Sequence, residues 1–115
     1  MKSTLLTALL VAALGLGATV AQAGEQLAEK HVKLGMNCQS CHGPDMKNPQ
    51  TPSMETCTGC HNIAQLVEKT KDIKPTNPHK SPHYGDTLEC ANCHLMHAES
   101  ENFCDSCHQF GFKVP

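Results

Sequence analysis

The sequence has few of the residues from which an apolar core is built. The whole chain contains one tyrosine, three phenylalanines and no tryptophan, and beyond residue 24 it has no long aliphatic run. A domain this small cannot bury enough apolar surface with such side chains alone. We therefore expect something other than its own side chains to fill its interior.

Arginine is also missing, because all nine basic residues are lysines against eleven acidic residues. The sequence shows no basic patch, and the formal net charge at pH 7 is −2. Binding to a nucleic acid backbone needs clustered positive charge. Nucleic acid is therefore not an expected partner.

The N-terminus has the features of an export signal. Lys2 precedes an apolar run over residues 5–20, and the small-x-small sequence Ala21-Gln22-Ala23 follows it. We interpret residues 1–23 as a secretory signal peptide that is cleaved after Ala23, which places the mature domain, residues 24–115, in the periplasm. The alternative is an uncleaved membrane anchor, but a spanning helix needs roughly 20 apolar residues.

Two stretches of the mature chain favour helix. Residues 26–34 carry Leu27, His31 and Leu34 on one face, with Gly35 after them as a cap, and residues 63–71 have a short apolar stripe. Six prolines punctuate the remaining chain, and no stretch predicts a strand. The predicted fold class is a small, mostly irregular domain with a few short α-helices, wrapped around internal cofactors.

All eight cysteines belong to four copies of Cys-x-x-Cys-His. This motif is the attachment signature of c-type haem. Its spacing places two thiols one helical turn apart, so that each can form a thioether with one vinyl group, and the adjacent histidine becomes the proximal iron ligand. The four units, which predict four covalently bound haem c groups, are Cys38, Cys41 and His42; Cys57, Cys60 and His61; Cys90, Cys93 and His94; and Cys104, Cys107 and His108.

Zinc sites and disulfides are the alternative uses of paired cysteines. Zinc is often held by Cys-x-x-Cys pairs, and disulfides are common in exported chains. Neither explains why a histidine directly follows all four pairs. Covalent haem explains every cysteine and these four histidines together.

Four further histidines remain, one for each haem, at positions 31, 79, 83 and 97. The match in number predicts that every iron is bis-histidine ligated and low spin, with His31, His79, His83 and His97 as distal ligands. The competing sixth ligands are methionines, which pair with histidine in some cytochromes: Met36, Met46, Met54 and Met96.

Spacing restricts which distal histidine serves which haem. His97 lies three residues after His94, too close to reach the opposite face of the same porphyrin, so it should ligate a different haem. His79 and His83 each follow a proline that stiffens the chain, and they could reach two haems of the C-terminal half. His31 is expected to fold back over the first haem.

The order of these histidines, with the segments "CANCHLMH" and "FCDSCHQFGFKVP", resembles the tetrahaem cytochrome domain of flavocytochrome c fumarate reductases and the related small tetrahaem cytochromes c, a cytochrome c3-like family. The resemblance covers residues 27–115. It implies a bent row of haems that passes single electrons. It also implies four ligand pairs: His42 with His31, His61 with His97, His94 with His79, and His108 with His83.

The sequence departs from the fumarate reductases in one respect, since it has no dinucleotide-binding glycine motif and no substrate domain. The resemblance therefore implies an electron carrier without catalytic residues of its own. Its expected partners are a separate periplasmic flavoprotein reductase and a membrane-bound quinol-oxidising cytochrome. Because haem propionates are negative, we expect a partner that presents lysines and docks less tightly in salt.

Three rival functions remain open. The chief one is a multihaem reductase of nitrite or hydroxylamine, which needs an open iron and hence one distal histidine that does not ligate, with His79 or His83 the first suspects. A zinc-binding or metal-storage module is the second. The third is a membrane-anchored quinol-oxidising cytochrome, which would require the signal segment to stay uncleaved.

Overall fold

The structure, a computed structural model, describes residues 25–115, and the predicted signal peptide lies outside these residues. In the described part, the chain forms six short helical segments and no β-strand, apart from one antiparallel bridge between Ser81 and Gly85. This confirms the predicted fold class. The segments are α1 (Leu27–Lys33), α2 (Gln39–His42), α3 (Met54–Thr58), α4 (Ile63–Lys69) and the 3-10 turns η1 (Cys90–Asn92) and η2 (Phe103–Ser106).

The two predicted helices are present, with slightly different ends. Helix α1 is one residue shorter at each end than the predicted 26–34, and Gly35 follows it with a φ of 92°. Helix α4 starts as predicted, where the Asn62 side chain accepts a hydrogen bond from the Gln65 N–H. It ends at Lys69 rather than residue 71, because the backbone of Thr70 leaves helical geometry, at φ −107° and ψ 6°.

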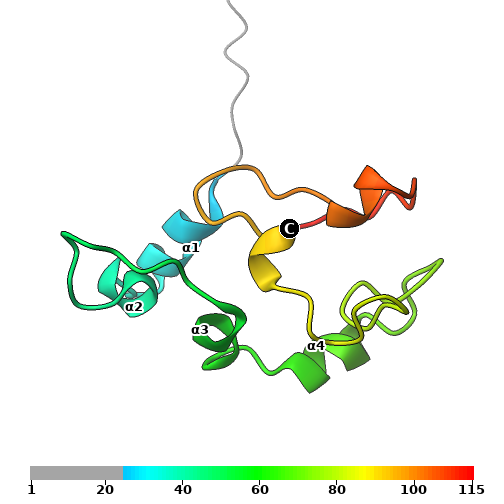
Figure 1. Ribbon diagram of the computed structural model, residues 1–115, viewed down its shortest axis with the longest axis horizontal. Coiled ribbons are helices and arrows are strands. Elements are labelled where there is room, and N and C mark those ends of the chain that lie inside the picture. Colours follow the sequence, from blue (N-terminus) through cyan, green and yellow to red (C-terminus); the bar gives the residue numbers. More distant parts are fainter. Residues whose placement is uncertain (1–24) are drawn as a thin grey trace, which may run out of the picture.

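The helical segments follow one another around an open ring (Figure 1). Helices α1 and α2 lie on one side and α3 and α4 along one edge, and the chain then returns through η1 near the middle of the view. A hydrogen bond of 2.9 Å from the Ala28 N–H to the Met96 carbonyl fastens α1 to the segment after η1. The C-terminus also ends near the middle of this view, beside η1.

No side chain between residues 25 and 115 is buried. Apolar residues of α1 and its end remain open, with Val32 57% and Leu34 83% exposed. The protein part alone therefore forms no apolar core over this range, as its composition predicts. Among the same residues, no helix has both the length and the apolar character to cross a membrane.

Candidate haem-binding sites

The four Cys-x-x-Cys-His units adopt the same local turn, although they lie in different elements. In each unit the histidine N–H donates to the carbonyl of the first cysteine, at 3.0, 2.9, 2.9 and 2.8 Å in chain order. This closes one helical turn, which brings both thiols and the imidazole to one side of the backbone. The turn is the local geometry that attachment to one porphyrin edge requires.

All eight cysteines are free thiols in the structure. Within residues 25–115, no group of three or more His, Cys, Asp or Glu side chains is arranged to hold a metal ion. The described part of the chain thus assembles neither a disulfide nor a zinc cluster from these units.

The eight histidines form four pairs, and each pair joins one motif histidine to one histidine outside the motifs. The ring centroids are 5.9–6.2 Å apart. No histidine is used twice, and each motif histidine has a histidine rather than a methionine opposite it. The pairs are His31–His61, His42–His97, His79–His94 and His83–His108.

This spacing fits two imidazoles on opposite sides of one metal ion. A metal–imidazole bond of about 2.0–2.1 Å, as known for zinc, plus about 1.2 Å from nitrogen to ring centre on each side gives centroids roughly 6.4–6.6 Å apart, within a few tenths of an ångström of the observed spacing. A direct ring stack is closer, as His108 and Phe110 show at 4.5 Å. The residues present therefore fit haem iron held between paired histidines.

Hydrogen bonds prepare two of these rings for ligation. His31 Nδ1 lies 2.7 Å from the Leu27 carbonyl, and His42 Nδ1 lies 2.8 Å from the Gln50 carbonyl. A carbonyl oxygen can only accept, so Nδ1 carries the proton in both rings. The Nε2 lone pair of each ring is thereby left for a metal.

Two of the four histidine pairs in the structure differ from those that the family resemblance implied. His31 lies opposite His61 rather than His42, and His97 lies opposite His42 rather than His61. The Ala28–Met96 hydrogen bond holds the segment before His97 against α1, so His97 takes the position expected of His31. In the structure His31 therefore does not lie opposite the first motif histidine, whereas the two C-terminal pairs agree with the implied ones.

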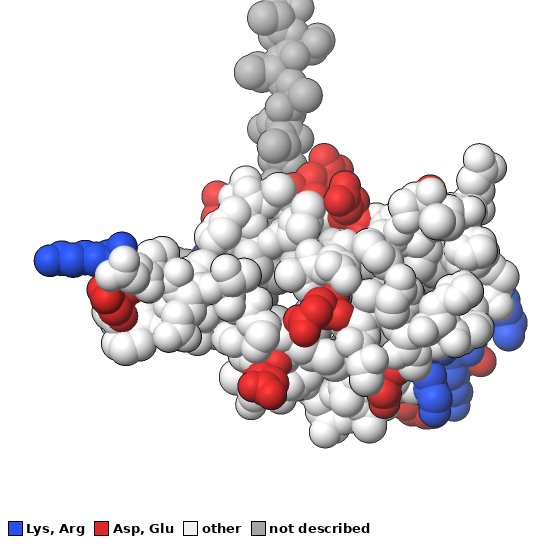
Figure 2. Space-filling view, viewed as in Figure 1, with Lys and Arg blue, Asp and Glu red and all other residues white. Residues whose placement is uncertain are grey.

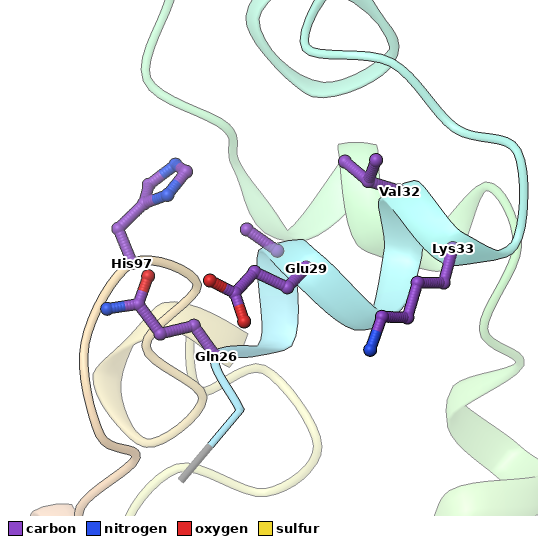
Figure 3. Close-up of a pocket in the computed structure, with 6 residues that line it drawn as sticks. Gln26, Glu29, Val32, Lys33 and His97 are labelled. Carbon is purple, nitrogen blue, oxygen red and sulfur yellow. The ribbon is translucent and has the colours of Figure 1, made fainter. Parts of the chain in front are cut away.

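A pocket of about 510 Å³ lies beside α1 and His97 (Figure 3). Ala28 and Val32 contribute apolar surface to this pocket, which His97 lines from the side opposite Val32, while Glu29 and Lys33 supply charge. Apolar surface in a pocket that also contains an imidazole would suit a porphyrin face. Its lining residues are Gln26, Ala28, Glu29, Val32, Lys33 and His97.

His79 and His94 are both partly buried, whereas at least one histidine is exposed in each of the other three pairs. Burial lowers the pKa of the His79 imidazole, and nearby His94 lowers it further. Burial likewise lowers the pKa of His94, although a hydrogen bond to the backbone of Pro115 opposes this and His61 adds to it. Both shifts favour the neutral imidazole, which is the form that binds a metal.

All the tyrosine and phenylalanine of the chain gathers around the last pair. Tyr84 lies edge-on to His83, and Phe103 lies edge-on to Tyr84. Phe110 stacks on His108, and Phe112 contacts Phe110. This aromatic cluster makes the His83–His108 site the most apolar of the four in side-chain type.

Charge is unevenly spread over the surface (Figure 2). In that view, acidic side chains are scattered over the middle of the face, and lysines appear only at two edges. The middle of this face therefore carries negative charge.

Comparison with known proteins agrees with the geometry. The family model described as cytochrome c3 matches residues 30–109. The chain belongs to the cytochrome c3 family. It is accordingly an electron-carrying cytochrome with covalently bound haem c.

Three relatives extend the comparison. The acrylate reductase cytochrome subunit of Shewanella woodyi is 38% identical over 101 residues, which cover 85% of each chain. The probable fumarate reductase Ifc3 of Shewanella frigidimarina is 32% identical over 95% of this chain, but the match spans 18% of that longer protein. The cytochrome c-type protein Cgr1 of Eggerthella lenta is 27% identical over 80% of this chain and 56% of its own length.

Proposed function

We propose that this chain is a periplasmic tetrahaem electron carrier whose four irons are each ligated by two histidines. The observation that supports it is the one-to-one pairing of eight histidines, each pair with one motif histidine and spaced for one metal ion. In this proposal the irons are held by His42 with His97, His61 with His31, His94 with His79, and His108 with His83. The eight motif cysteines attach the porphyrins.

Haem iron supplies one-electron chemistry, because it cycles between the ferric and ferrous states. The protein contributes two fixed imidazoles per iron, so neither oxidation state requires a change of ligand. Histidine in place of methionine also favours the ferric form and keeps the potential low. Four sites in so short a chain lie close together, which suits stepwise passage of single electrons.

We further propose that the electron acceptor is a separate reductase, in the class that reduces an unsaturated acid. Two relatives support this: one is named a cytochrome subunit of acrylate reductase, and the other a probable fumarate reductase much longer than this chain. The match spans 85% of the acrylate reductase subunit but 18% of the longer enzyme, which supports a carrier whose catalytic partner is a second, flavin-containing protein. A membrane-bound quinol-oxidising cytochrome is the proposed donor.

The experiment is a haem count on protein purified from the periplasm, with absorption spectra oxidised, reduced, and reduced under carbon monoxide. We expect four covalent haems, all low spin and unchanged by carbon monoxide. A high-spin fraction that binds carbon monoxide would show an open iron and would favour a multihaem reductase instead.

The acceptor is tested by stopped-flow mixing of the reduced cytochrome with a purified flavoprotein reductase and either acrylate or fumarate. We expect reoxidation that needs both the flavoprotein and the acid and that slows as salt is added. Reoxidation by the acid alone would place the catalytic site on this chain.

A further inference from the structure

Thr70 lies where helix α4 ends and contacts a histidine of the third pair. Its hydroxyl oxygen is 3.1 Å from His79 Nδ1. The contact is half-buried and joins two segments nine residues apart in sequence. Thr70 belongs to no haem motif, and its sequence position alone gives it no role.

The donors and acceptors around Thr70 fix the direction of this contact. The Thr70 hydroxyl has one proton, and two acceptors lie 2.7 Å away, the Leu66 carbonyl and Asn77 Oδ1. Its proton therefore goes to one of them, and the oxygen keeps lone pairs for His79. His79 Nδ1–H is then the donor and Thr70 the acceptor, with the Nε2 atom of His79 free for iron.

Asn77 also holds the His79 loop against helix α4 through two hydrogen bonds. Its Nδ2 donates to the Val67 carbonyl at 2.8 Å, and its Oδ1 accepts from the His79 backbone N–H at 2.9 Å. The loop that carries His79 is thus fastened to the last turn of α4 by side chains. Thr70 is the group in this network that reaches the imidazole itself.

We propose that Thr70 is a positioning residue for the third haem: its hydroxyl accepts the hydrogen bond of His79 Nδ1–H and so sets the tautomer, orientation and donor strength of that ligand. This inference rests on the proposed function, since it needs His79 to ligate iron. The side-chain hydroxyl opposite His79 Nδ1 distinguishes this histidine from His31 and His42. The Nδ1 atoms of those two rings face main-chain carbonyls, which no substitution removes.

The consequence is a tunable potential at one haem. A hydrogen bond accepted from Nδ1–H makes the imidazole a stronger donor and favours ferric iron. Removing the hydroxyl in Thr70→Val therefore raises the potential of the haem held by His79 and His94. If loss of the hydroxyl changes the reduction equilibrium constant of this haem about tenfold, its reduction potential rises by about 59 mV, the value for a one-electron couple.

The test is a redox titration of the wild-type holoprotein and of Thr70→Val, followed by NMR so that each haem is resolved. We expect an upward shift at one haem and smaller changes at the others. Thr70→Ser keeps the hydroxyl and should restore the wild-type potential. Thr87→Val is the matched control, because Thr87 donates to the Tyr84 carbonyl at 2.7 Å in an exposed turn and makes no hydrogen bond to a histidine among the described residues.

Each outcome bears on one claim. Four low-spin haems with unchanged potentials in Thr70→Val, or equal shifts in the Ser and Val variants, would overturn the role of Thr70 while leaving the carrier function intact. Too few haems, or a high-spin haem in the wild type, would instead overturn the proposed function. If Thr70→Val does not mature, slow exchange of the His79 Nδ1 proton in the reduced wild type supports the bond, and rapid exchange contradicts it.

Discussion

The two halves of the site hold their histidine pairs in different ways. In the first region, which contains the pairs His31–His61 and His42–His97, the paired histidines come from distant parts of the chain, and no tyrosine or phenylalanine of residues 25–115 contacts them. In the second region, with His79–His94 and His83–His108, the histidines outside the motifs both come from one proline-rich loop, and four aromatic residues surround the last pair. The first region therefore depends more on its cofactors for apolar contact than the second does.

Ring orientation separates the regions as well. The planes of His31 and His61 are 78° apart, whereas those of the other three pairs are 5–22° apart. Crossed and parallel imidazoles overlap differently with the iron d orbitals. One site of the first region should therefore differ electronically from the other three.

The largest expected effect is the loss of stability when one haem is removed, either from the first region or, in a separate variant, from the second. In Cys38→Ala/Cys41→Ala we expect three haems and a loss of unfolding free energy on the order of several kcal/mol. Burial of one aliphatic side chain contributes about 1.5–3 kcal/mol, and a porphyrin buries more apolar surface than such a side chain. In Cys104→Ala/Cys107→Ala the loss should be smaller, since Tyr84 still packs on Phe103. Mass spectrometry gives the haem number, and thermal unfolding gives the stability. Equal losses would contradict the contrast between the regions.

Substitution of single distal histidines tests the pairing within the first region. In His97→Ala the haem carried by Cys38 and Cys41 should become high spin and bind carbon monoxide, because His97 lies opposite His42. In His31→Ala the haem carried by Cys57 and Cys60 should do so. Assignment of the high-spin haem by NMR shows which haem each of the two histidines serves. The opposite assignment would restore the pairs that the family resemblance implied.

The crossed rings predict a distinct electron paramagnetic resonance signal. Crossed imidazole planes bring two iron d orbitals close in energy, which makes a low-spin ferric signal more anisotropic. We expect one such signal from the fully oxidised wild type and three signals of the ordinary rhombic form. His31→Ala should abolish the anisotropic one, while His83→Ala should leave it in place. Four similar signals would show that the regions do not differ in ring orientation.

The sequence predicted most of the fold because its strongest signals are local. Motif spacing requires one turn per unit, and all four turns are present; the apolar stripe and Gly35 located α1 within one residue. The histidine pairs of the first region could not be predicted in the same way. They depend on a contact between Ala28 and Met96, which lie far apart in sequence, and no residue pattern marks a main-chain hydrogen bond. Thr70 was missed for a related reason, since a threonine at a helix end has many ordinary uses.

The smallest predicted effect concerns Glu89, which connects the two regions. Its Oε2 accepts a hydrogen bond of 2.7 Å from the Met54 N–H, so a residue next to Cys90 caps helix α3 of the first region. Replacing a side chain that caps a helix in this way costs about 1 kcal/mol. We expect Glu89→Ala to lower the unfolding free energy by that amount in thermal or denaturant unfolding, with four haems retained. The control is Asp86→Ala, an exposed acid of the same loop whose side chain makes no hydrogen bond within residues 25–115. An equal loss in both variants would show that charge, rather than the link between the regions, is responsible.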